Sequence, residues 1–477
     1  MRSRLPSSGP DPIHLLVGAF FFMIGLVTLF GGREAGAAES WTVPDTVSER
    51  LRVLDRDVRR FVESGDALAY LPVRQLEHEF SVRSDADLEA FLDDLFAVAS
   101  EMGYDASRDM GAMPLNTTSQ RYNRTVPRMI LDGVDREPGP FSVHRYLFPE
   151  TGVPTFAGAP VAIYPEDLVA GDVDVAIVGI PNDMGSGRRN AEYGPRVMRV
   201  MNTLDEPDVR TLLDPHDVLS IVDYGDFRID NMSTERTVDH VTAMVAETAG
   251  TGAIPMMVGG DTSMLYPGVK GVAEVHGAGS FGLVHFSAHP DADRAAVHTI
   301  SDTQAVFMLL DEGIVEGVDL VQVGLRGKAV TADTLTWLRD QGARYHTMAE
   351  IKTRGYDAVL ARVTAEAEAG PEKTFVSIDV SVIEPTEMVS AGRIASNGLR
   401  VQQTADAIRH LCAAKEIVGF EITDMSPMLD YSRLSAVNAN TLLNACLVGV
   451  AARRAGFGPD EVHPLAIDHG QDGEATR

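Results

Sequence analysis

The sequence predicts an α/β protein built on a mostly parallel sheet. From about residue 152 onward, short runs rich in Val, Ile and Leu alternate with helical patterns, which is typical of a parallel sheet with helices on its faces. The chain has 477 residues, of which 44% are hydrophobic and 23% charged, a composition that suits a large globular domain with an extension. Polar residues follow several predicted strands, and open α/β sheets bind ligands at such strand ends.

The net charge and the spacing of the two cysteines exclude some binding partners and some kinds of site. A formal net charge of −28 argues against nucleic acid or an anionic membrane surface as a partner, because both would repel the chain. Cys412 and Cys446 each fall inside an apolar helical pattern, without the spacing of metal ligands or of a disulfide framework. We therefore expect two buried free thiols.

Residues 1–40 have the layout of a targeting segment. Arg2 and Arg4 precede the uncharged, mostly apolar run 15–30, and small residues follow at 35–38, as in a secretory signal. The run also approaches the length of a spanning helix, about 17–25 residues. A cleaved signal peptide and a membrane anchor through residues 15–30 both remain open. Either one predicts an exported protein that is periplasmic, secreted or membrane-anchored.

Residues 41–150 predict an N-terminal arm that is partly helical and partly irregular. Apolar residues from Val47 to Phe61 recur at helical spacing, and Gly65 closes the pattern. A second helix is expected to begin at Ser84 and to carry an apolar face to Met102. Scattered Pro, Gly, Asn and Arg predict an irregular segment over 106–150.

The α/β domain is expected over residues 151–455, followed by a tail at 456–477. Short apolar runs predict strands, and amphipathic patterns between and after them predict helices. The expected strands are Val173–Ile180, Val218–Asp223, Ile254–Val258, Phe281–Phe286, Leu320–Leu325, Thr374–Ile378 and Ile417–Ile422. The expected helices include Asp333–Gln341, Tyr356–Ala369, Thr404–Ala414 and Val437–Ala452.

Polar motifs stand where four of these strands end. They are Gly259-Gly-Asp-Thr-Ser263, Ser287-Ala-His-Pro-Asp291, Ser377-Ile-Asp-Val-Ser381 and Thr423-Asp-Met-Ser-Pro427. The carboxyl ends of parallel strands meet at one edge of the sheet, so the repeated placement predicts a common site there.

Further motifs make the stretch 150–455 resemble the ureohydrolase family of arginases, agmatinases, guanidinobutyrases and guanidine hydrolases, most of all its agmatinase-like branch. The motifs are Gly152-Val-Pro-Thr-Phe-Ala-Gly-Ala-Pro160, Gly179-Ile-Pro-Asn-Asp-Met-Gly185, Tyr193-Gly-Pro-Arg-Val-Met-Arg199, Asp223-Tyr-Gly-Asp226, Gln322-Val-Gly-Leu-Arg326 and Ser396-Asn-Gly-Leu399. The resemblance implies a three-layer α/β/α arginase-like fold, assembly into homotrimers or hexamers, and hydrolysis of agmatine, guanidine or a guanidino acid to urea and an amine.

The resemblance also implies a dinuclear centre of manganese, or in some members nickel. Three of its six ligand positions are kept, as His289, Asp291 and Asp379. The family's remaining histidine and two aspartates are replaced by the neutral side chains Thr262, Ser287 and Ser381. The two remaining carboxylates would leave two divalent ions and a hydroxide with excess positive charge, which is costly where solvent screens poorly. We therefore expect one divalent ion or none.

The substrate side of the site is altered as well. Asp424 stands where the resemblance implies a glutamate that binds the guanidinium, and His298 resembles a proton-shuttling histidine. Asp293 takes the position of an amide that faces the substrate's α-carboxylate in arginases, and its charge would repel that group. Asp183 and Asp261 are expected to orient neighbouring loops. Two functions remain open: an exported guanidino-compound hydrolase, or an inactive binding or assembly subunit with the same fold.

Overall fold

Eight parallel strands form the sheet that the sequence predicts. They are β1 (Val175–Gly179), β2 (Ile221–Asp226), β3 (Ile254–Val258), β4 (Gly282–Phe286), β5 (Leu320–Leu325), β6 (Arg344–Thr347), β7 (Lys373–Asp379) and β8 (Glu416–Thr423). Their order in the sheet is β2-β1-β3-β8-β7-β4-β5-β6, and each pair of neighbours runs parallel. The expected parallel architecture is therefore confirmed.

The sequence did not predict β6. Its four residues, Arg-Tyr-His-Thr, contain no aliphatic run, and the strand lies at an edge of the sheet, where it pairs only with β5. A short polar edge strand carries too little hydrophobic signal to be recognised from the sequence, because only one of its sides is covered.

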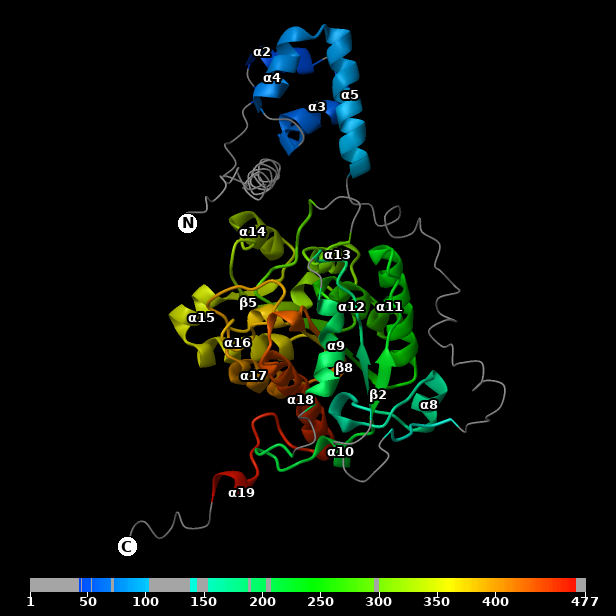
Figure 1. The fold of residues 1–477 in the computed structure, drawn as a ribbon. Coiled ribbons are helices and arrows are strands. Elements are labelled where there is room, and N and C mark those ends of the chain that lie inside the picture. Colours follow the sequence, from blue (N-terminus) through cyan, green and yellow to red (C-terminus); the bar gives the residue numbers. More distant parts are fainter. Residues whose placement is uncertain are drawn as a thin grey trace, which may run out of the picture. The chain divides into compact units, whose positions relative to one another are not determined.

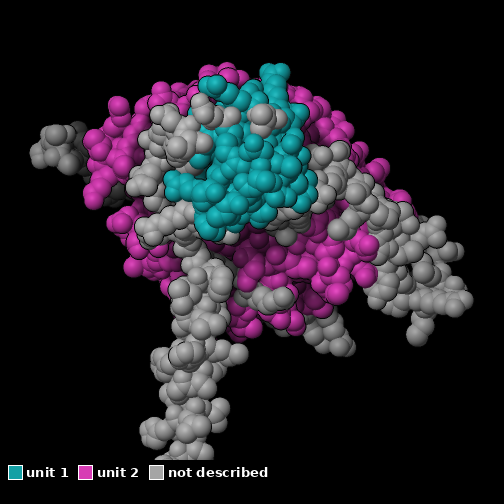
Figure 2. Space-filling view, turned by 90° about the horizontal axis from the view of Figure 1, so that it is seen from above, with its two compact units in different colours: residues 1–102 teal, residues 103–477 magenta. Residues whose placement is uncertain are grey.

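The computed structural model describes residues 43, 45–52, 54–69, 73–102, 138–143, 153–187, 190–202, 207–295 and 300–468. The chain divides into two units, residues 1–102 and 103–477, which Figure 2 colours separately. The expected export segment 1–40, most of the irregular segment 106–150, His298 and the end of the tail lie outside the described residues. Those expectations remain predictions.

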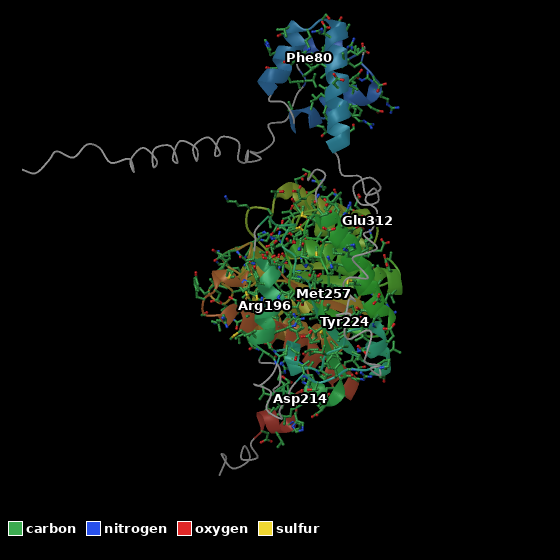
Figure 3. All side chains as sticks on the ribbon, turned by 45° about the vertical axis from the view of Figure 1, so that its right-hand side comes forward. Phe80, Arg196, Asp214, Tyr224, Met257 and Glu312 are labelled. Carbon is green, nitrogen blue, oxygen red and sulfur yellow. A yellow bond between two sulfur atoms is a disulfide. The ribbon has the colours of Figure 1, made fainter. Side chains whose placement is uncertain are left out.

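Helices cover both faces of the sheet in the second unit (Figure 1). The helices are α8 (Pro165–Ala170), α9 (Gly194–Val200), α10 (Pro215–Val218), α11 (Thr234–Gly250), α12 (Leu265–His276), α13 (Ala305–Asp311), α14 (Ala332–Asp340), α15 (Met348–Arg354), α16 (Tyr356–Glu368), α17 (Val401–Ala414), α18 (Leu434–Ala455) and α19 (Pro464–Ile467). Successive strand residues point to opposite faces. Met256 and Val258 therefore pack with α16, α17 and α18, whereas Met257, labelled in Figure 3, packs with α11, α12 and α13.

A disulfide joins Cys412 of α17 to Cys446 of α18, so the expectation of free thiols is wrong. The two Cα atoms lie 5.3 Å apart, within the usual range for a disulfide. Gly449 allows this close approach, since a Cβ atom there would lie 2.6 Å from the carbonyl oxygen of Arg409 and 2.7 Å from Cβ of Cys412. The sequence could not reveal the pairing, because it depends on how the two helices pack.

Helix α18 is long and apolar enough to cross a membrane, and it is the only such helix among the described residues. Of its most apolar window, 67% is buried inside the protein, and residues such as Leu442, Leu443 and Leu447 belong to the core beside the sheet. This burial accounts for its hydrophobicity without a membrane.

The first unit is helical, as the sequence predicts. It contains α2 (Asp45–Leu51), α3 (Arg56–Glu63), α4 (Val73–Val82) and α5 (Asp85–Met102). The apolar pattern from Val47 to Phe61 spans two helices, because the carboxylate of Asp55 accepts a hydrogen bond from the Asp57 amide at 2.9 Å and caps the start of α3. Phe80, labelled in Figure 3, belongs to a core that this unit forms from its own helices.

Candidate functional site

Four of the predicted site residues lie at the carboxyl ends of four adjacent strands, β3, β8, β7 and β4. Thr262 follows β3, Asp424 follows β8, Asp379 ends β7 and Ser287 follows β4. Each of these side chains is at most 1% exposed. The structure therefore brings together the polar motifs that the sequence places in four separate segments.

Arg393, which the sequence did not single out, lies at the centre of this group. Its Nη1 donates to Oδ1 of Asp291 at 2.6 Å, and its Nη2 donates to Oδ2 of Asp379 at 2.5 Å. Nη2 also lies 2.8 Å from Oγ1 of Thr262. Nε lies 3.3 Å from a carboxylate oxygen of Asp302. The guanidinium is thus surrounded by acids contributed by three segments of the chain.

The main chain of Arg393 is fixed at the same place. Its amide donates to Oδ2 of Asp424 at 2.8 Å, and its carbonyl oxygen lies 3.0 Å from Nε2 of His289. The preceding residue must be small, since a Cβ atom at Gly392 would collide with the Asp424 carboxylate. Main-chain and side-chain contacts together determine where the guanidinium lies.

Two of the acidic residues in the site have a strained main-chain conformation. Asp291 has φ 47° and Asp424 has φ 68°, values in the left-handed region that non-glycine residues seldom adopt. The carbonyl oxygen of Asp291 accepts a hydrogen bond from the Val306 amide at 2.9 Å, and the Asp424 amide donates to the Gly260 carbonyl at 2.8 Å. Such strain persists where surrounding contacts enforce it, and it is concentrated at functional sites.

The charges in the site are distributed around Arg393. Burial lowers the pKa of Arg393, but the charges of Asp291 and Asp379 outweigh this effect and hold that pKa well above its ordinary value. Burial likewise works to raise the pKa of Asp379, whereas the Arg393 guanidinium brings it below the ordinary value. Arg393 is therefore a cation, and Asp379 is its ionised partner.

The pKa values of two further acids in the site are raised. Burial, followed by the charge of Asp379, raises the pKa of Asp424 well above its ordinary value. Burial raises the pKa of Asp302 to about 7, although Arg393 opposes the shift. The Arg393 guanidinium therefore faces Asp379 as an ionised partner, whereas burial works against the charged forms of Asp424 and Asp302.

Hydroxyl groups complete the shell of Asp379. Oγ1 of Thr262 donates to Oδ2 of Asp379 at 2.9 Å, and Oγ of Ser287 lies 3.3 Å from the same oxygen. The Ser381 amide donates to Oδ1 at 2.7 Å. Thr262, Ser287 and Ser381, which the sequence predicts at substituted ligand positions, thus act here as neutral groups around one carboxylate, directly or through the main chain.

A pocket of about 300 Å³ adjoins the guanidinium. His289, Asp291, Asp293, Thr303, Thr334 and Arg393 supply its polar lining. Asp293 is exposed; its Oδ1 accepts a hydrogen bond from the Ala295 amide at 2.9 Å. The Asp291 carboxylate is already paired with Arg393. Asp293 therefore supplies the pocket's accessible negative charge.

A buried polar chain runs beneath the site across β4, β7 and β8. Nδ1 of His285 lies 2.9 Å from Oγ of Ser377, which donates to Oε1 of Glu421 at 2.6 Å. Nε2 of His285 lies 3.4 Å from Oδ2 of Asp291. Burial raises the pKa of Glu421 to about 8. The chain supports Asp291 from the core side. The strand-end motifs in the sequence include Ser377 but indicate neither His285 nor Glu421.

The loop acids behave as the sequence predicts. Oδ2 of Asp183 accepts a hydrogen bond from the Asn190 amide at 2.8 Å, and Oδ2 of Asp261 accepts one from the Ser186 amide at 2.8 Å. For Arg393 the only signal was indirect. Several acids at strand ends require a cation, but nothing in the sequence says which residue supplies it.

These residues do not fit a dinuclear metal centre. Three of the ligand positions that the resemblance implies carry neutral side chains, and the carboxylates of Asp291 and Asp379 are both paired with the Arg393 guanidinium. No group of three or more His, Cys, Asp or Glu side chains within the described residues is arranged to hold a metal ion. The ligand roles of His289, Asp291 and Asp379 stay predictions, and a metal would have to displace Arg393.

Sequence comparison relates the chain to known hydrolases. Residues 173–449 match the model of the arginase family. The chain is 28% identical over 308 residues to a guanidinobutyrase of Pseudomonas aeruginosa, with 64% of this chain and 94% of that protein covered. It is also 28% identical over 296 residues to a mitochondrial agmatinase of Gallus gallus, with 60% and 86% covered.

Solved structures share the fold. Proclavaminate amidinohydrolase of Streptomyces clavuligerus superposes with a TM-score of 0.58 at 23% identity, with 64% of this chain and 99% of that chain covered. Formiminoglutamase of Trypanosoma cruzi, solved with Mn²⁺, superposes with a TM-score of 0.52 at 21% identity, with 59% and 95% covered. The second of these neighbours therefore holds manganese on the same fold.

Proposed function

Because the chain belongs to the arginase family, we propose that it is an exported member that keeps the fold but does not hydrolyse guanidino compounds. It acts instead as a binding or assembly subunit. One observation carries the proposal: the Arg393 guanidinium lies between the carboxylates of Asp291 and Asp379. By resemblance, those carboxylates would bind the metal ions that activate water.

The substrate side supports the same proposal. A guanidinium is best held by an ionised carboxylate, yet burial and the charge of Asp379 raise the pKa of Asp424 well above its ordinary value. Oδ2 of Asp424 already accepts the amide of Arg393. The carboxyl group that resembles the family's guanidinium ligand is therefore shifted towards its neutral form, and it already accepts a hydrogen bond from the main chain.

Export is part of the proposal. Disulfides persist in oxidising compartments and are rare in the cytosol, so the Cys412–Cys446 bridge supports a location outside the cytoplasm. The basic, apolar and small-residue layout of residues 1–40 supports it independently. The resemblance further suggests a homotrimer or hexamer, which light scattering on the purified chain would test.

The proposal is tested by urea release. The purified full chain, supplied with Mn²⁺ or Ni²⁺, should release no more urea from agmatine, guanidine or 4-guanidinobutyrate than an Asp379→Ala variant does. The guanidinobutyrase of Pseudomonas aeruginosa, measured in parallel, serves as the positive control. Urea above the Asp379→Ala background from any of these compounds would overturn the proposal.

A second candidate is a hydrolase with an altered metal site. His289, Asp291, Asp379 and Asp424 survive, and the relatives carry the names guanidinobutyrase and agmatinase. The pocket beside His289 and Asp293 has room for a small guanidino compound. The triple variant Thr262→His, Ser287→Asp, Ser381→Asp discriminates between the two. Urea release by the triple variant alone indicates that the natural chain has lost the activity.

A further inference from the structure

We propose that Arg393 is a built-in cation that takes the place of divalent metal in this chain, so that the site is complete without metal. The inference deepens the proposed function and rests on the same residues. It makes a separate claim, however: the folded protein depends on the Arg393 charge and is indifferent to divalent ions.

The contacts of the guanidinium are those of an integral cation. Asp291, Asp379 and Thr262 each accept from Nη1 or Nη2 at between 2.5 and 2.8 Å. The carbonyl oxygen of Asp302 lies 3.2 Å from Nη1. Arg393 is 6% exposed, and Asp291 and Asp379 are 2% and 0% exposed. A planar fork of this kind satisfies two carboxylates with directed hydrogen bonds, which a lysine ammonium does less well.

The carboxylates of Asp291 and Asp379 cannot both stay charged and unpaired if the Arg393 cation is removed. Oδ2 of Asp291 and Oδ2 of Asp379 both lie within 3.5 Å of Oγ of Ser287, so the two carboxylates are close neighbours. Two buried like charges at such a distance repel strongly. If Arg393 is removed, they must either bind a proton or recruit another cation.

The surrounding chain holds Arg393 in this position. Asp424 binds its amide and His289 contacts its carbonyl oxygen, while Gly392 leaves space for the Asp424 carboxylate. The main chain of Arg393 is therefore anchored at both its amide and its carbonyl group. A surface arginine that had merely folded inward would lack these main-chain contacts.

The first experiment compares Arg393→Ala with the natural full chain. Thermal unfolding is measured in EDTA and in Mn²⁺, and metal content is measured by mass spectrometry after dialysis. We expect the natural chain to hold well under one manganese per chain, with a Tm that neither EDTA nor Mn²⁺ shifts. Arg393→Ala should lose roughly 5–10 °C in Tm, and Mn²⁺ should restore part of that loss by binding the freed carboxylates.

Arg326→Ala is the matched control. Arg326 is also buried near the site, but it donates to main-chain oxygens, among them those of Ser381, Ala395 and Ser396. Its removal should lower Tm without leaving a pair of freed carboxylates, so Mn²⁺ should not restore stability. Equal Mn²⁺ rescue of both variants would show that the effect is not specific to the site and would overturn the inference.

A second set of variants covers the case in which Arg393→Ala does not fold. Arg393→Met keeps the length of the side chain and removes its charge. Adding Asp291→Asn and Asp379→Asn to it removes the charges that are left unpaired. We expect the triple variant to be more stable than the single one. Failure of the triple variant to recover stability would overturn the inference.

The outcomes separate this inference from the proposed function. One or two manganese ions per natural chain, with a Tm that falls in EDTA, would overturn the built-in cation whether or not urea is released. Conversely, urea release from a chain free of metal and indifferent to EDTA would overturn only the proposed function.

Discussion

At the scale of single residues, Glu421 is an acid that the fold keeps in its neutral form. It is 1% exposed, and burial raises its pKa from the ordinary 4.5 to about 8. One of its oxygens accepts from Ser377, and the other has no hydrogen-bond partner among the described residues. A protonated carboxyl can occupy such a position at a lower cost than a carboxylate can.

This raised pKa predicts a stability that depends on pH. Because the folded pKa lies above the unfolded one, the contribution of Glu421 is fully present below about pH 4.5 and is lost as pH rises through about 8. As pH rises from about 4.5 to about 8, the free energy of unfolding of the natural chain should therefore decrease relative to that of Glu421→Gln, by at most about 1.4 kcal/mol per pH unit. Urea unfolding at several pH values measures it.

The exposed Glu274 of α12 provides the control for this prediction. Glu274→Gln should leave the pH profile of the natural chain unchanged, because that side chain is solvated. A Glu421→Gln variant with the same pH profile as the natural chain would contradict the prediction.

At the scale of elements, a disulfide joins α17 to α18. The bridge between Cys412 and Cys446 closes a loop across a sequence separation of 34 residues. Closing a loop of that length restricts the unfolded chain by about 3–4 kcal/mol on the chain-entropy model. Gly449 lets the helices approach closely enough for the bridge to form.

The double variant Cys412→Ala, Cys446→Ala should therefore unfold at lower urea concentration, with a loss of about 2–4 kcal/mol. Dithiothreitol should lower the stability of the natural chain and leave the double variant unaffected. A thiol assay in denaturant should find no free thiol in the natural chain. Two titratable thiols in protein from its native host would contradict both the bridge and its stabilising effect.

At the scale of the whole molecule, the helical unit and the α/β unit have separate hydrophobic cores. Leu51, Leu88 and Leu92 belong to the first core and are at most 1% exposed. The sheet and its helices form the other two large clusters. Each unit therefore buries its own apolar residues.

Leu92→Ala should destabilise the helical unit by about 2–5 kcal/mol, since it removes a fully buried side chain. Calorimetry of the full chain should show a shift in the transition of that unit, with the α/β transition unchanged. The control is Val82→Ala in the same unit, where the side chain is 60% exposed and the expected change is within about 0.5 kcal/mol. A common shift of all transitions would contradict independent unfolding.

Much of this architecture could be predicted from the sequence, because buried parallel strands are continuous apolar runs. Ile254–Val258 and Leu320–Leu325 have the predicted bounds in the structure. The meeting of the polar motifs was predictable too, since Thr262, Ser287, Asp379 and Asp424 each lie at or just beyond the end of a strand. Arg393 and the disulfide were not, because both depend on contacts between segments that lie far apart in the chain.

The position of β8 in the sheet has a consequence for how the protein is made. β8 is the last strand along the chain, yet it lies between β3 and β7. Until Glu416–Thr423 has been synthesised, β1–β3 and β4–β7 remain two half-sheets, each with an open edge. Open edges invite pairing with other chains. A chain that ends before β8 would therefore expose the edges of β3 and β7 and be prone to aggregation.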